Sequence, residues 1–187
     1  MGITSDLFPA EAYANVRDEK LSSTCLPVKK VEDIRDRRTG RRGIDNFENF
    51  LKFLAPPARG SVTLAVARGE AVYSAIGCAS CHVPQLLTGE NAILAFDRKP
   101  VPLFSDLLLH DVGTGDGIDQ AAANGNEIRT PSLWGLRFRR PLLHDGSAPG
   151  IEYAIERHHG EAENVRDKYL RLNAGEKSDL LAFLKSL

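Results

Sequence analysis

Several residue types are scarce in this sequence, and each scarcity narrows the possible functions. Its 187 residues include three cysteines, and no stretch approaches the roughly 18 to 20 apolar residues that span a bilayer. An odd and small number of cysteines argues against a disulfide framework, and pairing two of them would leave Cys25 without a role. A formal net charge of −1 gives no reason to expect nucleic acid as a partner. We therefore expect no membrane span and no nucleic acid, and the oligomeric state stays open.

The N-terminal third of the chain is predicted to hold an extension and a linker. Residues 1–44 are polar, lack the apolar run of a secretion signal, and end in the arginine-rich string "RDRRTGRRG". These arginines indicate either a solvated loop or a docking patch for an acidic group. Residues 45–60 are predicted to form a helix and a proline-rich linker that begins at Pro56. The apolar face of that helix comprises Phe47, Phe50, Leu51 and Leu54.

Residues 61–187 are expected to form one domain built from helices. A helix is predicted from an N-cap at Ser61 to a glycine stop at Gly77, with a stripe of Ala65, Gly69, Val72 and Ile76. The string "APGIEYAIERHHG" predicts a short helix, and Asn173 with Glu176 forms a capping box for the last one. Residues 83–128 are predicted to be mostly loop, and no β-rich region is expected. The fold class predicted from these elements is all-α.

A long irregular stretch needs something to organise it, and the string "CASCH" suggests what that is. Cys78, Cys81 and His82 are compatible with a zinc site, a redox disulfide or a covalent haem. Structural zinc usually needs a second cysteine pair, which is absent, and a thioredoxin-type disulfide follows a strand instead of a helix. On one helical turn, two cysteines three residues apart reach both porphyrin vinyl groups, and the next side chain projects under the iron. The motif thus favours haem c, with His82 as the proximal ligand.

Longer strings resemble a known family. "RGEAVYSAIGCASCH" and "LNAGEKSDLLAFLKSL" are similar to the first and last helices of cytochrome c domains. "FSDLLLHDVGTG", "RTPSLWGLRFRRPLLHDGSA" and "IEYAIERHHGEA" resemble the C-terminal haem domain of the bacterial di-haem cytochrome c peroxidase superfamily, in its di-haem oxidoreductase branch. The resemblance covers about residues 45–187. It implies a cytochrome c-like domain with long loops around one haem, preceded by an irregular N-terminal extension. The N-terminal haem domain of the family carries a second attachment motif, which is absent here, so the chain is either a fragment with a remnant of that domain or a single-haem relative.

The second axial ligand of the iron decides what such a haem can do. The only methionine is Met1, so a histidine–methionine haem is not expected. In the relatives, the distal ligand follows a helix that matches "IEYAIERHHG", and the alignment puts His158 at that position. His159 is one residue later and would point about 100° away on a helix. The alternative is that both are surface histidines near a helix end.

Other residues are candidates for contacts around the haem. The Arg129 guanidinium matches a haem propionate, although a solvated arginine is the alternative. The resemblance places His144 near the haem edge, whereas His110 is either satisfied by a loop carbonyl or part of the haem surroundings. Trp134 is either a core residue or a haem contact. The resemblance also allows a calcium ion near the "RTP" segment, a site that the missing partner domain would leave incomplete.

Two functions follow, with a third as the alternative to both. The favoured one is electron transfer through a single bis-histidine haem c, with a redox protein or an N-terminal haem domain as the partner. The second is a peroxidase-type oxidoreductase, which needs a displaceable sixth ligand and a nearby acid–base group. The third is a haem that serves only stability. Because thioether attachment occurs outside the bacterial inner membrane, we expect a periplasmic or exported protein whose leader was removed or belongs to a longer chain.

Overall fold

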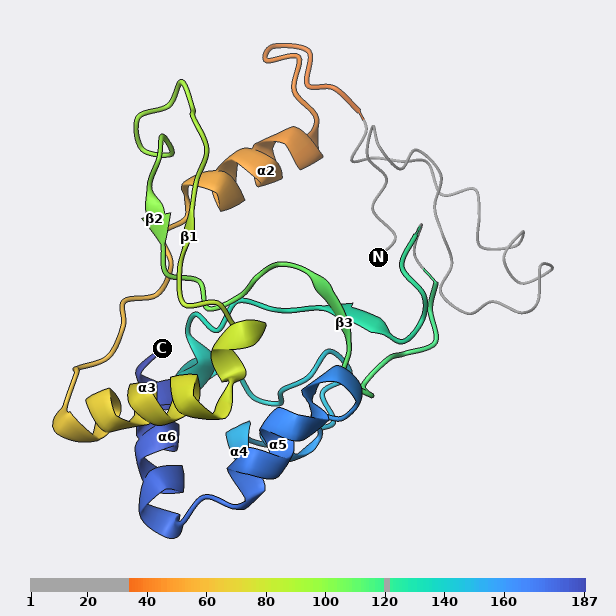
Figure 1. Ribbon diagram of the computed structural model, residues 1–187. Coiled ribbons are helices and arrows are strands. Elements are labelled where there is room, and N and C mark those ends of the chain that lie inside the picture. Colours follow the sequence, from red (N-terminus) through yellow and green to blue (C-terminus); the bar gives the residue numbers. More distant parts are fainter. Residues whose placement is uncertain (1–33, 120–121) are drawn as a thin grey trace. The chain divides into compact units, whose positions relative to one another are not determined.

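The structure is a computed structural model that describes residues 34–119 and 122–187. The chain divides into two compact units, Met1–Ala55 and Pro56–Leu187 (Figure 1). Most of the predicted N-terminal extension, with Cys25, lies outside the described residues. Among the described residues, no helix combines the length and apolarity needed to cross a membrane.

The described part of the first unit contains helix α2, Gly43–Phe53. Asp45 closes its first turn, because its carboxylate accepts the Arg42 backbone N–H and pairs with the Arg42 guanidinium at 2.7 Å. The arginine-rich string before it forms an exposed turn, in which Asp36 accepts backbone N–H groups of residues 38 and 39. The predicted apolar face of α2 is present and exposed, at Phe47, Phe50, Leu51 and Leu54.

The second unit is organised by two helices from opposite ends of its sequence. Helix α3, Leu64–Ile76, packs across α6, Ala174–Ser186 (Figure 1). The α6 capping box between Asn173 and Glu176 forms as predicted. Helix α3 begins at Thr63, whose hydroxyl accepts the Val66 N–H, so the predicted N-cap is two residues too early. The α3–α6 interface is the centre of the core, and it includes Tyr73, Phe183, Leu180 and Leu184.

The buried face of α3 differs from the predicted stripe in two of its four members. Gly69 and Ile76 are buried as expected, while Val66 and Tyr73 are buried in place of Ala65 and Val72. The stripe is therefore rotated by about one residue, and this rotation brings an aromatic ring into the core. The Tyr73 ring lies 5.0 Å from the Phe183 ring and 6.2 Å from the Phe104 ring, measured between centroids.

The middle of the second unit corrects the predicted all-α class. Strand β1, Leu86–Leu87, pairs with β2, Pro100–Val101, and β3, Leu109–Asp111, pairs with β4, Glu127–Arg129. Both pairs are antiparallel, and they accompany five α-helices within the described residues. The prediction failed because periodicity carries little signal in strands of two or three residues. These strands form because extended backbone between helices still needs hydrogen-bond partners.

Short helices complete the unit on the side that carries the remaining histidines. Helix α4, Ile151–Glu156, is followed by the 3₁₀ turn η4, Gly160–Ala162, and by α5, Glu163–Leu170. Another 3₁₀ turn, η3, spans Leu136–Phe138 and packs against α6. Within this segment, η4 packs against β3.

Candidate functional site

The cysteine motif forms one tight turn directly after α3. The helix ends at Gly77, in the left-handed conformation with a φ of 104°, and the 3₁₀ turn η2 follows over Cys78–Ser80. The Cys78 carbonyl accepts the backbone N–H groups of Cys81 and His82, the latter at 3.0 Å. The two cysteines and the histidine are thus held on a single helical turn, and the cysteines do not form a disulfide.

The imidazole of His82 is oriented by a backbone carbonyl. Its Nδ1 donates to the Phe104 carbonyl oxygen at 3.1 Å, which leaves Nε2 with a free lone pair. Phe104 is buried and has a φ of 55°, a left-handed conformation that non-glycine residues rarely adopt. The buried Tyr73 hydroxyl donates to the His82 carbonyl, which fixes the backbone of the same residue. Strained backbone of this kind is typical of functional sites.

His158 is oriented in the same way from the other side. It follows α4, and its Nδ1 donates to the Ala154 carbonyl at 2.6 Å, so its Nε2 is also left free. His159, the next residue, is exposed, and its Nδ1 lies 2.6 Å from an Arg166 guanidinium nitrogen. Of the two adjacent histidines, the structure therefore brings His158 towards the cysteine motif.

The imidazoles of His82 and His158 face each other at a distance that fits one metal ion between them. Their ring centroids are 6.5 Å apart and their planes are inclined by 50°. Metal–nitrogen bonds of about 2.0–2.1 Å on opposite sides of one ion, with about 1.1 Å from nitrogen to ring centre, give about 6.3 Å. Two oriented imidazoles with free Nε2 atoms, and two thiols in the adjacent turn that form no disulfide, are a donor set that suits haem c. The residues present therefore fit the group.

Burial sets the protonation states of these donors. Burial lowers the pKa of His82 to about 4 and also lowers the pKa of His158, so both imidazoles are neutral at pH 7 and able to donate a lone pair. Burial raises the pKa of Cys78 to about 11 and raises that of Cys81 as well. Redox-active cysteine pairs depend on a lowered thiol pKa. This site therefore suits metal ligation and thioether attachment better than disulfide exchange.

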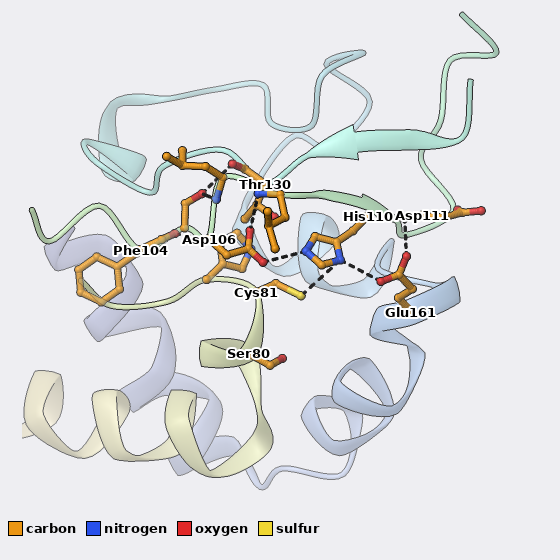
Figure 2. A network of polar contacts seen from close by, with 12 residues as sticks. Ser80, Cys81, Phe104, Asp106, His110, Asp111, Thr130 and Glu161 are labelled. Carbon is orange, nitrogen blue, oxygen red and sulfur yellow. Dashed lines mark hydrogen bonds and ion pairs between the residues drawn. The ribbon is translucent and has the colours of Figure 1, made fainter. Parts of the chain in front are cut away.

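A network of charged groups lies beside Cys81 (Figure 2). His110 bridges two carboxylates, with Nε2 at 2.8 Å from Asp106 Oδ2 and Nδ1 at 2.8 Å from Glu161 Oε2. The Cys81 sulfur lies 3.9 Å from His110 Nδ1, and the ligand atoms of Cys81, Asp106 and His110 are all within 4.8 Å of one another. These atoms resemble a small cation site. Both His110 nitrogens already bind carboxylates, however, which favours a structural role for this histidine.

The other predicted site residues lie at the margin of this region. Arg129 is exposed at the end of β4, opposite Leu109. Trp134 is half-buried, and its Nε1 donates to the Pro102 carbonyl at 2.7 Å. His144 is exposed, and its Nε2 lies 3.9 Å from Asp116 Oδ2, beyond hydrogen-bond distance. The haem contacts predicted for these three residues, and the calcium site near the "RTP" segment, stay predictions.

The structure adds four residues that the sequence did not single out. Tyr73 and Phe104 orient His82, and Asp106 and Glu161 bind His110. Phe104 acts through its carbonyl oxygen, so its side chain gave no signal. Asp106 and His110 are four residues apart within "FSDLLLHD", a spacing that a search for acid–histidine pairs would have found. Glu161 is 51 residues from His110 and gave no comparable signal.

Comparisons with known proteins identify the family that this chain matches. The family described as "Di-haem oxidoreductase, putative peroxidase" matches residues 1–187. The methylamine utilization protein MauG of Methylophilus methylotrophus is 30% identical over 131 residues, which are 64% of this chain and 36% of that protein. MauG of Methylorubrum extorquens is 26% identical over 135 residues, 64% of this chain and 33% of that protein. The chain spans about a third of the length of these curated relatives.

Two solved structures are similar to this chain over part of its length. Kuenenia stuttgartiensis hydrazine synthase, studied under xenon, has 25% identity and a TM-score of 0.49, over 72% of this chain and 51% of the other. A MauG-like protein associated with microbial copper homeostasis has 27% identity and a TM-score of 0.41, over 68% of this chain and 47% of the other. Haem c binding is a property of the matched family. The match over residues 1–187 shows that this chain belongs to the di-haem oxidoreductase family of the di-haem cytochrome c peroxidase-like superfamily.

Proposed function

We propose that the unit Pro56–Leu187 is an electron-transfer module that carries a single haem c. Cys78 and Cys81 would attach the haem through thioether bonds, and His82 and His158 would hold its iron. The observation that carries this proposal is the pair of facing imidazoles, 6.5 Å apart between centroids, each with its Nδ1 bound to a backbone carbonyl. Family membership supplies the haem c redox chemistry on which the proposal depends.

The residues of this chain suit a role that moves electrons with little rearrangement. When bound, the haem supplies a one-electron couple whose potential depends on the ligands and their surroundings. The Phe104 carbonyl and the Tyr73 hydroxyl hold His82 at its ring and its backbone. The Ala154 carbonyl holds His158, and burial keeps both rings neutral. Ligands that are fixed in this way keep the same geometry in both oxidation states.

The surroundings of the site suggest how it meets a partner. We also propose that Arg129 pairs with a haem propionate, that Trp134 and His144 contact the haem edge, and that calcium binds near the "RTP" segment. Because the chain spans about a third of its curated relatives, the electron partner is either an N-terminal haem domain or a separate redox protein. Thioether attachment further places the protein in the periplasm or outside the cell.

A second function, peroxide-dependent oxidation, is favoured by the family, whose description includes peroxidase. It requires His158 to leave the iron so that peroxide can bind. His110 would then be the nearest candidate for handling a proton, since it lies among Asp106, Glu161 and Cys81. The hydrogen bond from His158 to the Ala154 carbonyl opposes this release, and electron transfer is therefore the first choice.

Replacement of His158 tests the proposed ligation. The His158→Ala variant of the holoprotein is expected to change the iron from six-coordinate low-spin to high-spin, as measured by visible and EPR spectroscopy. His159→Ala is the matched control, because His159 is the adjacent residue but is exposed, with its ring next to Arg166. This control should retain the low-spin spectrum.

Three results would contradict the proposal. The first is a colourless protein after expression with the haem-attachment machinery. The second is a His158→Ala spectrum identical to that of the unsubstituted protein. The third is rapid uptake of cyanide or azide by the unsubstituted ferric protein, together with turnover of hydrogen peroxide and a donor, which would favour the peroxidase function.

A further inference from the structure

The segment that orients His82 is attached to the cysteine motif by backbone hydrogen bonds. The Asp106 N–H donates to the Cys81 carbonyl at 2.8 Å, and the Ser105 N–H donates to the Val83 carbonyl at 2.9 Å. The buried Ser105 hydroxyl donates to the Thr130 carbonyl at 2.8 Å, which anchors this segment to β4 and the loop after it. Residues 104–106 therefore move with the proximal histidine.

A second segment of the same loop is attached to the distal histidine. The His159 N–H donates to the Val112 carbonyl at 2.9 Å, and the Asp111 N–H donates to Glu161 Oε1 at 3.0 Å. Gly160 has a φ of 51°, and a Cβ at this position would lie 2.4 Å from the Asp111 carbonyl oxygen. The backbones of residues 111–112 and 159–161 are thus in close contact, directly after His158.

His110 lies between these two attachments and connects them. One ring nitrogen meets Asp106, on the proximal side, and the other meets Glu161, on the distal side, each at 2.8 Å (Figure 2). A carboxylate only accepts, so both ring nitrogens must donate, and only the imidazolium form can do so. The bridge is therefore a cation between two anions, which is stronger than a neutral hydrogen bond.

The distal histidine depends on such a connection, because its own helix is short. Helix α4 has six residues, fewer than a helix needs to be stable alone, so tertiary contacts determine where its end lies. Ile151 is buried at the start of α4, whereas the charged bridge lies just beyond its C-terminal end.

We propose that Asp106, His110 and Glu161 form a clamp that positions His158 opposite His82, so that His110 is a positioning residue for the second axial ligand. The inference rests on the proposed bis-histidine function and extends it to residues that do not touch the iron. The clamp sets both the separation and the mutual tilt of the two imidazole planes, 6.5 Å and 50° in this structure.

The test compares His110→Ala with Arg68→Ala in the holoprotein. Arg68 forms a two-pronged ion pair with Asp179, at 2.6 and 2.9 Å, that joins α3 to α6 away from the clamp. This control reports the effect of losing an ion pair in the same unit. Three quantities are measured: the g-values of the low-spin ferric EPR signal, which depend on the tilt between axial imidazoles, the rate at which cyanide displaces the distal ligand, and amide exchange at Asp111 and His159.

The clamp predicts that His110→Ala shifts the EPR g-values, accelerates cyanide binding about fivefold to tenfold and increases exchange at both amides. Arg68→Ala should leave all three close to those of the unsubstituted protein. Equal behaviour of the two variants would overturn the clamp. A high-spin spectrum of the unsubstituted protein would refute the proposed function instead, and amide exchange would then decide the clamp by itself.

Discussion

The closest approach between α3 and α6 occurs at Gly69, and its replacement by alanine should loosen the interface that supports the site. A Cβ at position 69 would lie 1.9 Å from the Asp179 carbonyl oxygen, 2.5 Å from the Asp179 carbonyl carbon and 2.8 Å from the Phe183 Cβ. Two of these atoms belong to the backbone of α6 and cannot turn aside as a flexible side chain would. The helices themselves must move.

The size of the effect follows from that displacement. Restoring an ordinary contact of about 3.4 Å requires the helices to separate locally by about 1.5 Å, and gaps of 0.5–1 Å already forfeit a quarter to a half of the contact energy. Overpacking of this kind costs about 1–3 kcal/mol or more, while alanine regains up to about 1 kcal/mol of helix propensity. We expect Gly69→Ala to lower the free energy of unfolding by about 1–2 kcal/mol.

Urea unfolding of the holoprotein, followed by circular dichroism, measures this change. At roughly 2–4 °C per kcal/mol, the melting temperature should fall by about 2–8 °C. Gly89→Ala is the matched control, because position 89 is exposed and a Cβ there meets no atom within 4 Å. A Gly69→Ala variant that is as stable as the unsubstituted protein would show that α3 and α6 do not pack as described.

Two further predictions concern the polar contacts. Hydrogen bonds to His110 and Asp111 lower the pKa of Glu161. Its contribution to the free energy of unfolding is therefore complete above the usual glutamate pKa near 4.3, and it is lost as the pH falls through the lowered pKa. Hydrogen bonds to Glu161, and to a smaller extent Asp106, raise the pKa of His110. Its contribution to the free energy of unfolding is therefore complete below about pH 6.5, and it is lost as the pH rises through the raised pKa. The difference in urea midpoint between the unsubstituted protein and His110→Ala should therefore be largest at about pH 4.5–6.5, and a pH-independent difference would contradict this. Tyr73→Phe removes the hydroxyl that donates to the His82 carbonyl and should cost about 1–2 kcal/mol in the same urea assay, whereas an unchanged midpoint would show that this hydrogen bond contributes nothing.

Long, regular features of this chain were predictable from the sequence, because they depend on local patterns. The capping box at Asn173 and the glycine stop at Gly77 are set by residues within one turn, and both occur where they were expected. The start of α3 was placed too early because serine and threonine both make good N-caps, and it is Thr63, two residues after Ser61, whose hydroxyl accepts the Val66 N–H. Local signals located these helices to within a few residues.

The loops and the clamp were less predictable, because they depend on partners far away in the sequence. The strands around His110 are too short for an alternating pattern, and β3 pairs with residues 16 to 20 positions away in the sequence. The Phe104 carbonyl accepts a hydrogen bond from His82, which is 22 residues away in the sequence. Glu161 accepts one from His110, which is 51 residues away. The position of His158 was inferred from family resemblance, since its own sequence gives no reason to prefer it to His159.

The packing of α3 on α6 has a consequence for the order of events during synthesis. Gly69 and Phe183 are 114 positions apart, so α3 lacks its main packing partner, α6, until almost the whole unit has left the ribosome. At about 5–20 residues per second, that interval lasts roughly 6–23 s. Until then, the interface with α6 that supports the cysteine turn after α3 cannot form.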